Sequence, residues 1–156
     1  GPLREPVETG LKRANLLVSI GSQDAQSQFA ATLPETHPTH MQASVEPLQT
    51  GMDWTDTPFF AFAGIGHPEK FFNTLRDLGA KLVHTEPLDD HQQFSTTLLQ
   101  RLDSDAKTKG AQLVTTEKDA ARLPASFRSK VITLPVRLKL YDETALQSAL
   151  KALPSR

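Results

Sequence analysis

An apolar run that leads into two glycines and a proline is the feature that most constrains the fold of this chain. Residues Phe59–Ala63 are apolar throughout, Gly64 and Gly66 follow, and Pro68 stands where a helix would have its first residue. This order predicts a strand, a tight loop and a helix. Glycines let backbone N–H groups approach a ligand, and an open helix N-terminus favours anions. Without a third glycine the pattern falls short of the dinucleotide fingerprint, and such a turn more often simply connects two elements.

The chain after this loop alternates between strand and helix patterns. The predicted elements, in order, are a helix from Pro68 to Gly79, a strand Lys81–His84, a helix from its cap Asp90 to Gly110, a strand Ala111–Thr115, a helix from its cap Thr116 to Leu123, a strand Val131–Leu134, a half-exposed edge strand Val136–Leu140, and a last helix capped by Asp142. Alternation with short connections predicts parallel strands joined by right-handed crossovers. The expected fold is therefore α/β, a small three-layer sandwich with a mostly parallel sheet.

The first third of the chain has weaker patterns. Leu11–Ala14 predicts a short helical turn, and Asn15–Ile20 predicts a buried strand. Residues 22–57 are rich in Gln, Thr, Ser and Pro, and only Met41–Leu48 alternates enough for an exposed strand. We therefore expect a short N-terminal segment over residues 1–21, a linker or hinge over residues 22–57, and an α/β domain over residues 58–156.

Composition excludes several classes of protein. Seventeen basic and eighteen acidic side chains among 156 residues give a net charge of -1, which argues against a nucleic-acid partner. The chain has no cysteine, so disulfides, thiolate metal sites and cysteine nucleophiles are excluded, and a reducing, cytoplasmic setting fits. No apolar run approaches the roughly 20 residues that span a bilayer. The basic residues between Lys118 and Lys139 form either a face for anionic ligands or lipid headgroups, or a solvated surface.

Ligands of parallel α/β sheets bind beyond the carboxyl ends of the strands, so three predicted loops share one edge of this sheet. These loops are residues 64–67, 86–91 and 115–119. In the second loop, Asp90 beside His91 suits a base held in one tautomer, half of a metal site, or a simple helix cap. In the third loop, threonine hydroxyls and Lys118 suit a phosphate or a nucleotide sugar, with acidic side chains for ribose hydroxyls. The alternative for this loop is a capped helix with internal charge pairs.

Four ordered motifs together carry a resemblance to a known family. They are Gly1–Pro6, Phe62–Pro68 with the following Phe71, Asp90-His91 with Phe94, and Thr116–Asp119. In order and spacing they resemble the C-terminal half of tetraacyldisaccharide 4′-kinase, the lipid A kinase of Gram-negative bacteria. The motifs cover nearly the whole chain.

The resemblance implies a P-loop kinase that uses ATP and Mg²⁺ to phosphorylate the 4′-hydroxyl of a tetraacyldisaccharide 1-phosphate at the cytoplasmic face of the inner membrane. Its partners would be the lipid A precursor, a peripheral membrane surface, and an N-terminal P-loop domain of which residues 1–21 would be a remnant. The catalytic histidine of the family falls on His91, which would work with an Asp of the N-terminal domain. The nucleotide-binding or cleft-lining residues implied by the resemblance are Arg4, Glu5, Gly64, Gly66, His67, Asp90, Thr116, Glu117, Lys118 and Asp119.

The sequence also departs from the family pattern. It contains no Gly-x-x-x-x-Gly-Lys-Ser/Thr, so we expect this chain alone to be inactive and to hold no cofactor tightly. Asn15 stands where the family usually has an Asp. Two other functions stay open: a stand-alone α/β module that binds a nucleotide or phosphate without catalysis, and a metal-dependent hydrolase that uses Asp89, Asp90, His91 and His67. We expect no metal site of the chain's own.

Overall fold

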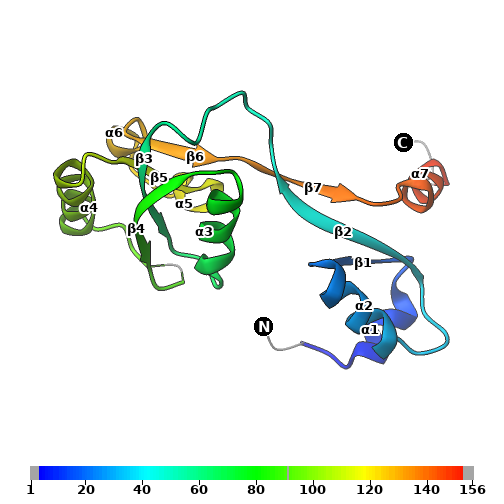
Figure 1. Ribbon diagram of the computed structural model, residues 1–156. Coiled ribbons are helices and arrows are strands. Elements are labelled where there is room, and N and C mark those ends of the chain that lie inside the picture. The colour runs from blue at the N-terminus through cyan, green and yellow to red at the C-terminus, as the bar shows by residue number, and fades with distance from the viewer. Residues whose placement is uncertain (1–3, 91, 153–156) are drawn as a thin grey trace. The chain divides into compact units, whose positions relative to one another are not determined.

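The computed structural model describes residues 4–90 and 92–152 and divides the chain into two compact units (Figure 1). The first unit combines Gly1–Glu46 with Arg137–Arg156, and the second is Pro47–Val136. The second unit is thus inserted into the sequence of the first. The boundaries expected from the sequence differ, because the last strand and helix group with the N-terminal segments and not with the α/β domain.

A four-stranded parallel sheet is the centre of the second unit. Its strands are β3 (Pro58–Ala63), β4 (Lys81–Pro87), β5 (Gln112–Thr116) and β6 (Val131–Leu134), in the order β4-β3-β5-β6. Each neighbouring pair is parallel, with Phe60 opposite Leu113 and Val114 opposite Ile132. The predicted α/β class and parallel sheet are confirmed.

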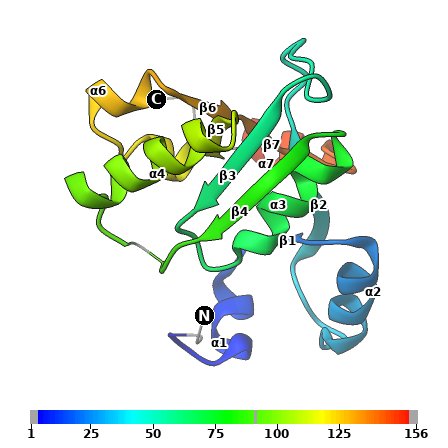
Figure 2. The same ribbon diagram turned by 60° about the vertical axis from the view of Figure 1, so that its left-hand side comes forward.

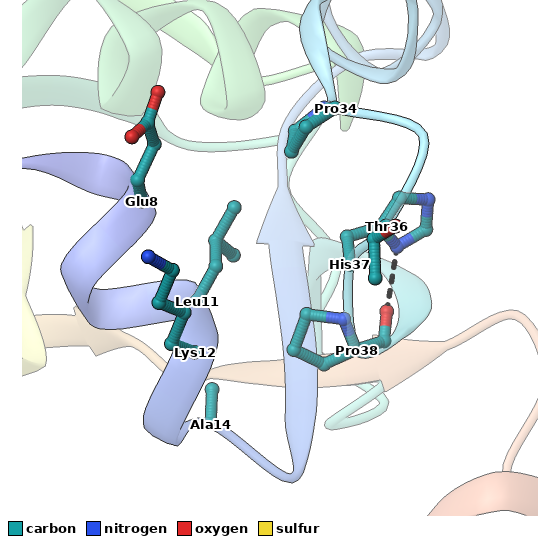
Figure 3. Close-up of a pocket in the computed structure, with 8 residues that line it drawn as sticks. All are labelled: Glu8, Leu11, Lys12, Ala14, Pro34, Thr36, His37 and Pro38. Carbon is teal, nitrogen blue, oxygen red and sulfur yellow. Dashed lines mark hydrogen bonds between the residues drawn. The ribbon is translucent and has the colours of Figure 1, made fainter.

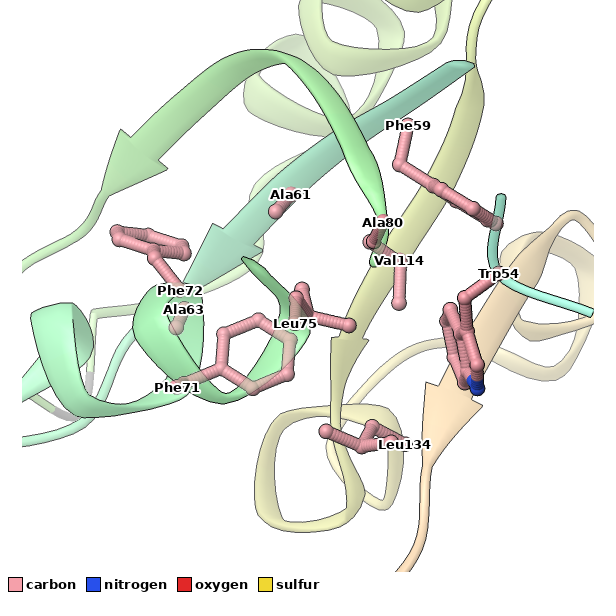
Figure 4. Close-up of a cluster of buried hydrophobic side chains, with 10 residues drawn as sticks. All are labelled: Trp54, Phe59, Ala61, Ala63, Phe71, Phe72, Leu75, Ala80, Val114 and Leu134. Carbon is pink, nitrogen blue, oxygen red and sulfur yellow. The ribbon is translucent and has the colours of Figure 1, made fainter. Parts of the chain in front are cut away.

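Helices cover both faces of this sheet and make the second unit a three-layer sandwich. Figures 1 and 2 show α3 (Pro68–Asp77) on one side and α4 (Thr96–Thr108) on the other. Because successive strand residues point to opposite faces, β3 supplies two separate cores. Phe59, Ala61 and Ala63 pack with Phe71, Phe72, Leu75 and Trp54 (Figure 4). Phe60 and Phe62 pack on the other face with Leu98, Leu99, Leu102 and Phe127.

Several predicted element ends are correct, and one helix start is wrong. Helix α3 begins at Pro68, and Gly79 follows it with φ 85°, a conformation that side-chain-bearing residues rarely adopt. Helix α4 begins at Thr96 and not after Asp90, because Ser95 Oγ accepts the N–H of Leu98 at 3.2 Å and caps it. Residues 92–95 precede this helix as irregular chain.

The predicted helix from Thr116 to Leu123 is two short helices instead. Helix α5 (Glu117–Ala120) is capped by Thr116 as expected, since its Oγ1 accepts the N–H of Asp119 at 3.1 Å. Helix α6 (Ala125–Arg128) then follows Pro124 and packs Phe127 into the sheet. Proline has no N–H and fixes φ, so it ends one helical segment and suits the start of the next.

The first unit contains a three-stranded sheet in the order β1-β2-β7. Its elements are α1 (Val7–Arg13), β1 (Leu16–Ile20), α2 (Gln23–Thr32), β2 (Thr39–Pro47), β7 (Val136–Leu140) and α7 (Thr144–Lys151). Strands β1 and β2 are parallel, with Val18 opposite Met41. Asp142 accepts the N–H of Thr144 at 2.9 Å, while Glu143 occupies the cap position of α7.

Residues 22–57 contain more structure than the predicted linker or hinge. Helix α2 lies there because Ser22 caps it and Gln26, only 2% exposed, donates hydrogen bonds to the backbone oxygens of Ser19 and Ala43. A buried polar residue conceals the helical periodicity from the sequence. Strand β2 is expected from the sequence to be an exposed strand, but its residues Met41 and Ala43 are buried.

Strand β1 forms where predicted but is not buried. It lies at one edge of its sheet, and the side chains of Val18 and Ile20 are 41% and 58% exposed. The two chain segments that lead into and out of the second unit meet, because Leu48 N–H donates to Pro135 O at 2.9 Å. No helix of the described chain combines the length and apolar character needed to cross a bilayer.

Candidate functional site

The three predicted loops meet beyond the carboxyl ends of β3, β4 and β5, and their contacts confirm that they share one edge of the sheet. Leu88 N–H donates to Ala63 O at 2.9 Å, which joins the loops after β3 and β4. Gly64 N–H donates to Asp119 Oδ2 at 2.9 Å, which joins the loop after β3 to α5. We call this region, residues 64–67, 88–90, 92 and 116–119, the loop edge.

Asp119 is the central side chain of the loop edge and is fully buried. Its Oδ2 accepts hydrogen bonds from Gly64 N–H and Thr116 Oγ1, both at 2.9 Å, and its Oδ1 pairs with Arg122 Nη1 at 3.3 Å. A buried carboxylate is stable when hydrogen bonds and a cation compensate for its lost hydration. Asp119 therefore holds the loops in place and does not itself present a free oxygen to a ligand.

The two glycines of the first loop have different surroundings. A Cβ on Gly64 would lie 3.3 Å from Asp119 Oδ1 and 3.3 Å from Asp89 O, which is tighter than ordinary contact. A Cβ on Gly66 would lie 4.0 Å from Asp90 Oδ2 and meet no closer atom. Gly64 is thus needed for close packing of the loops, whereas exposed Gly66 leaves its backbone open to solvent. His67 beside it is exposed and occupies the cap position of α3.

The second loop contains short-range hydrogen bonds and forms an ion pair with Lys118. Asp89 N–H donates to Gln92 Oε1 at 3.0 Å, and Gln92 N–H donates to Asp89 O at 2.9 Å. Asp90 Oδ1 lies 3.6 Å from Lys118 Nζ, and both side chains are 50% exposed. The loop thus contacts α5 through Asp90. The predicted catalytic residue His91 lies outside the described residues.

The remaining residues of the third motif have separate roles. Thr116 caps α5 and bonds to Asp119, so its hydroxyl is already engaged. Glu117 Oε2 accepts the N–H of Val136 at 3.0 Å, which links α5 to the chain leaving β6. Lys118 is half-exposed, and its charged end lies beside the second loop. A half-exposed ammonium group of this kind is suited to bind an anion.

Sequence reasoning missed Arg122. Its Nη2 donates to Gln92 O at 2.6 Å, its Nη1 reaches Asp119, and its guanidinium lies 5.1 Å from the centre of the Phe94 ring. The spacing of three residues from Asp119 on a helical pattern is a signal that favours such a pair. The backbone partner on the second loop has no counterpart in the sequence pattern.

Several of the basic residues between Lys118 and Lys139 have acidic partners. Arg122 turns toward Asp119, Lys130 pairs with Asp103 at 3.1 Å, and Lys139 belongs to the other unit, where it pairs with Glu46 at 3.2 Å. The sequence gives no information on which acidic residues lie beside these basic residues. Of the two alternatives, a face for anionic ligands or lipid headgroups and a solvated surface, the ion pairs of Lys130 and Lys139 favour the solvated surface.

Electrostatics beside the loop edge centres on Glu86, near the end of β4. The hydrogen bond from Arg101 Nη2 to Glu86 Oε1, at 2.8 Å, and the contact with His84 Nε2, at 3.2 Å, lower the pKa of this carboxyl below its ordinary value of 4.5. Glu86 is therefore an ionised partner of α4 at neutral pH. It is occupied by these contacts and is not placed as a free acid or base.

Arg4 and Glu5 belong to the first unit, whereas the loop edge belongs to the second. Glu5 pairs with Arg13 of α1, and Arg4 is exposed. The first unit also contains a pocket of about 510 Å³ between α1 and the chain before β2 (Figure 3). It is lined by Glu8, Leu11, Lys12, Ala14, Pro34, Thr36, His37 and Pro38. None of the predicted site residues lines it, so the pocket and the expected chemistry do not coincide.

Metal-binding geometry is not found in the described part of the chain. No three His, Asp or Glu side chains within residues 4–90 and 92–152 are grouped closely enough to hold an ion. Asp89, Asp90 and His67 therefore do not form such a group among themselves.

Comparison with known proteins decides the family. The sequence model of tetraacyldisaccharide-1-P 4′-kinase matches residues 1–154. The chain belongs to this kinase family. A tetraacyldisaccharide 4′-kinase from Dinoroseobacter shibae is 56% identical over 98% of the chain, and one from Jannaschia sp. is 52% identical over the whole chain. The chain spans only 46% and 48% of these two relatives.

A solved structure of the same family supports the fold. The crystal structure of LpxK from Aquifex aeolicus in complex with ATP covers 96% of this chain with a TM-score of 0.65 and 22% sequence identity, and 45% of that protein is matched. The resemblance to the tetraacyldisaccharide kinases noted in the four motifs is therefore confirmed. As in the two sequence relatives, this chain corresponds to about half of the longer protein.

Proposed function

We propose that this chain is the C-terminal portion of a kinase that transfers the γ-phosphate of ATP to the 4′-hydroxyl of a tetraacyldisaccharide 1-phosphate. The observation that carries this proposal is the family match over residues 1–154, together with relatives of which the chain spans about half. The product would be a lipid A precursor. The ATP-bound structural relative is consistent with ATP as the phosphate donor.

The phosphate-binding machinery would come from a preceding P-loop domain. The chain contains no Gly-x-x-x-x-Gly-Lys-Ser/Thr, and phosphoryl transfer in P-loop enzymes depends on that loop, its lysine and Mg²⁺. Mg²⁺ would neutralise charge on the transferred phosphate when bound. The exposed apolar edge at Val18 and Ile20 suits a contact with such a domain, because apolar edge strands of soluble proteins are normally covered. This chain by itself would be inactive and bind ATP weakly.

The loop edge would form the wall of the nucleotide cleft that faces the P-loop domain. Lys118 would exchange its exposed contact with Asp90 for a phosphate oxygen, since a phosphate is the stronger charge partner. The open backbone at Gly66 and the exposed His67 would line the same cleft. Thr116, Glu117 and Asp119 would support this wall through their contacts inside the second unit. Arg4 and Glu5 would lie near the nucleotide or at the junction with the P-loop domain.

His91 would be the catalytic residue. By its place in the Asp-His motif, it would assist an Asp of the P-loop domain in accepting the proton of the 4′-hydroxyl, a role in which positioned bases contribute large rate factors. Acceptors of this kind are lipids, so the complete kinase would work at the cytoplasmic face of the inner membrane through peripheral contacts.

The test is phosphorylation of a tetraacyldisaccharide 1-phosphate by the complete kinase chain that contains this sequence. His91→Ala should lower kcat by at least about tenfold to a hundredfold. His37→Ala, an exposed histidine of the first unit, is the matched control and should leave the rate unchanged. An unchanged rate in the His91 variant would remove its catalytic role.

A second candidate is a stand-alone module that binds a nucleotide or phosphate without catalysis. The missing phosphate loop favours it for the isolated chain. Calorimetric titration of the 156-residue chain with ATP separates the two. Weak or absent binding agrees with a half-kinase, whereas sub-micromolar affinity would favour the binding module.

A further inference from the structure

The guanidinium of Arg122 bridges the helix after β5 and the loop after β4. Nη2 donates to the carbonyl oxygen of Gln92 at 2.6 Å, and Nη1 pairs with Asp119 Oδ1 at 3.3 Å. The group also lies 5.1 Å from the centre of the Phe94 ring. One side chain thus makes a backbone contact, an ion pair and an aromatic contact, and it keeps only 27% of its surface exposed.

The contact with Asp119 makes Arg122 a fixed reference point. Asp119 is fully buried and is itself held by Gly64 N–H and Thr116 Oγ1. The planar guanidinium has donors in a rigid fork, so pairing with a fixed carboxylate also sets the direction of its other donors. The position of Gln92 O is therefore determined by α5 and by the sheet beneath it.

The loop that Arg122 holds has little regular structure of its own. Residues 88, 89 and 92–95 are irregular, and the hydrogen bonds described within the loop are short-range: two join Asp89 and Gln92, and one runs from Ser95 N–H to Gln93 O at 3.0 Å. A loop with few internal bonds takes its position from its anchors. Phe94, under the guanidinium, packs against the core at Phe62 and anchors the same segment from below.

We propose that Arg122 is a positioning residue for the phosphoryl transfer. It fixes the backbone of the second loop beside Asp90 and Lys118 without touching ATP or the lipid, because its donors are directed to Gln92 O and Asp119. This inference rests on the proposed function, which assigns proton acceptance to the loop through His91. Loss of the bridge would loosen the loop and reduce kcat, because small displacements of a catalytic group cost large factors in rate.

Two substitutions distinguish a role of Arg122 in positioning the loop from a role that needs only its positive charge. Arg122→Lys keeps a cation next to Asp119, but a compact ammonium cannot span Asp119 and Gln92 O in one geometry. Arg122→Met removes the charge and keeps the length of the side chain. Arg128→Ala is the matched control, because Arg128 is an exposed arginine on the neighbouring helix α6.

The first measurement is amide hydrogen exchange on the 156-residue chain. The N–H groups of Asp89 and Gln92 are hydrogen-bonded in the loop, so both Arg122 variants should exchange them at least tenfold faster than the original chain, with the amides of β3 and β5 unchanged. Arg128→Ala should leave all of them unchanged. If the loop amides keep their protection in both Arg122 variants, the positioning role is overturned.

The second measurement is kinetics of the complete kinase. Both Arg122 variants should lower kcat about tenfold or more with KM for ATP within twofold, and Arg122→Lys should not restore the rate. A rise in KM at constant kcat, or full rescue by lysine, would overturn the inference in favour of direct binding or of charge alone. If the complete chain with Arg122 intact shows no lipid phosphorylation while the exchange result holds, the proposed function fails and the loop anchor stands.

Discussion

The carboxylate of Asp119 accepts the backbone N–H of Gly64 at 2.9 Å and so joins two loops that are 55 positions apart in sequence. The bond brings together the turn after β3 and the first turn of α5, which are both parts of the motifs typical of the kinase family. Residues of two different motifs therefore form a hydrogen bond with each other. This bond stabilises the loop edge and so fixes the backbone on which its exposed residues lie.

Substitution of Asp119 by Ala should destabilise the second unit by at least about 2 kcal/mol. The change removes charged hydrogen bonds and leaves Arg122 without its carboxylate, and breaking a fully buried ion pair costs about 3–5 kcal/mol. Arg122 is partly exposed, which reduces the cost. Trp54, the only tryptophan, packs 5.3 Å from Phe59, so its fluorescence during urea unfolding reports on this unit. Asp105→Ala, a half-exposed acid on α4, is the control and should cost under about 1 kcal/mol.

Alanine at the two glycines of the first loop should give opposite results. Gly64→Ala places a Cβ against Asp119 and Asp89 O, and we expect a loss of about 1–3 kcal/mol, as for other overpacked sites. Gly66→Ala has room and should change the free energy of unfolding by less than about 0.5 kcal/mol. Urea unfolding followed by tryptophan fluorescence measures both. Equal effects of the two substitutions would contradict the difference in packing.

The stabilising effect of Glu86 should disappear at low pH. Its pKa in the folded protein is lowered below 4.5, chiefly by the hydrogen bond from Arg101, so the folded state binds the proton less tightly than the unfolded state. The contribution is fully present above the unfolded pKa and is lost as the pH falls through the lowered pKa. Glu86→Gln should cost up to about 1 kcal/mol at pH 7 and progressively less below about pH 4.5. A difference that grows on acidification would show that the sign is wrong.

Removal of the Phe72 ring should severely weaken the second unit. Phe72 is fully buried between α3 and the sheet, and truncation of such a ring to Ala typically costs about 3–5 kcal/mol. Phe29→Ala, on α2 of the first unit, should leave the Trp54 transition unchanged, because Phe29 is partly exposed and contacts His40 within its own unit. A shift of that transition in the Phe29 variant would mean that the two units unfold together.

Much of the second unit could be predicted from sequence, because its signals are local. The apolar run Phe59–Ala63, the proline at Pro68 and the turn at Gly79 each act on their own backbone, so the strand and helix ends follow from them. The cap at Ser95 was missed because Asp90 offered an equivalent signal five positions earlier, and the pairing of Asp90 with Lys118 is not visible in sequence.

The first unit and the supporting contacts of the site depend on long-range partners. Helix α2 is stabilised by Gln26, a polar residue that becomes buried only because it bonds to β1 and β2. The role of Arg122 likewise depends on its hydrogen bond to Gln92 O, 30 positions away in sequence. A pattern of apolar residues contains no information about such bonds, whereas a family resemblance identified the motif residues without saying which of them are structural.

The hydrogen bond between Leu48 and Pro135 holds the two ends of the second unit together. Its first and last residues are neighbours, so the segment Pro47–Val136 begins and ends at the same place. Segments with adjacent ends can be removed, exchanged or circularly permuted with little change to their interiors. The α/β sandwich therefore lies, as one continuous segment, between β2 and β7 of the first unit's sequence. All residues of the loop edge belong to this segment, so they would be kept together in any such rearrangement.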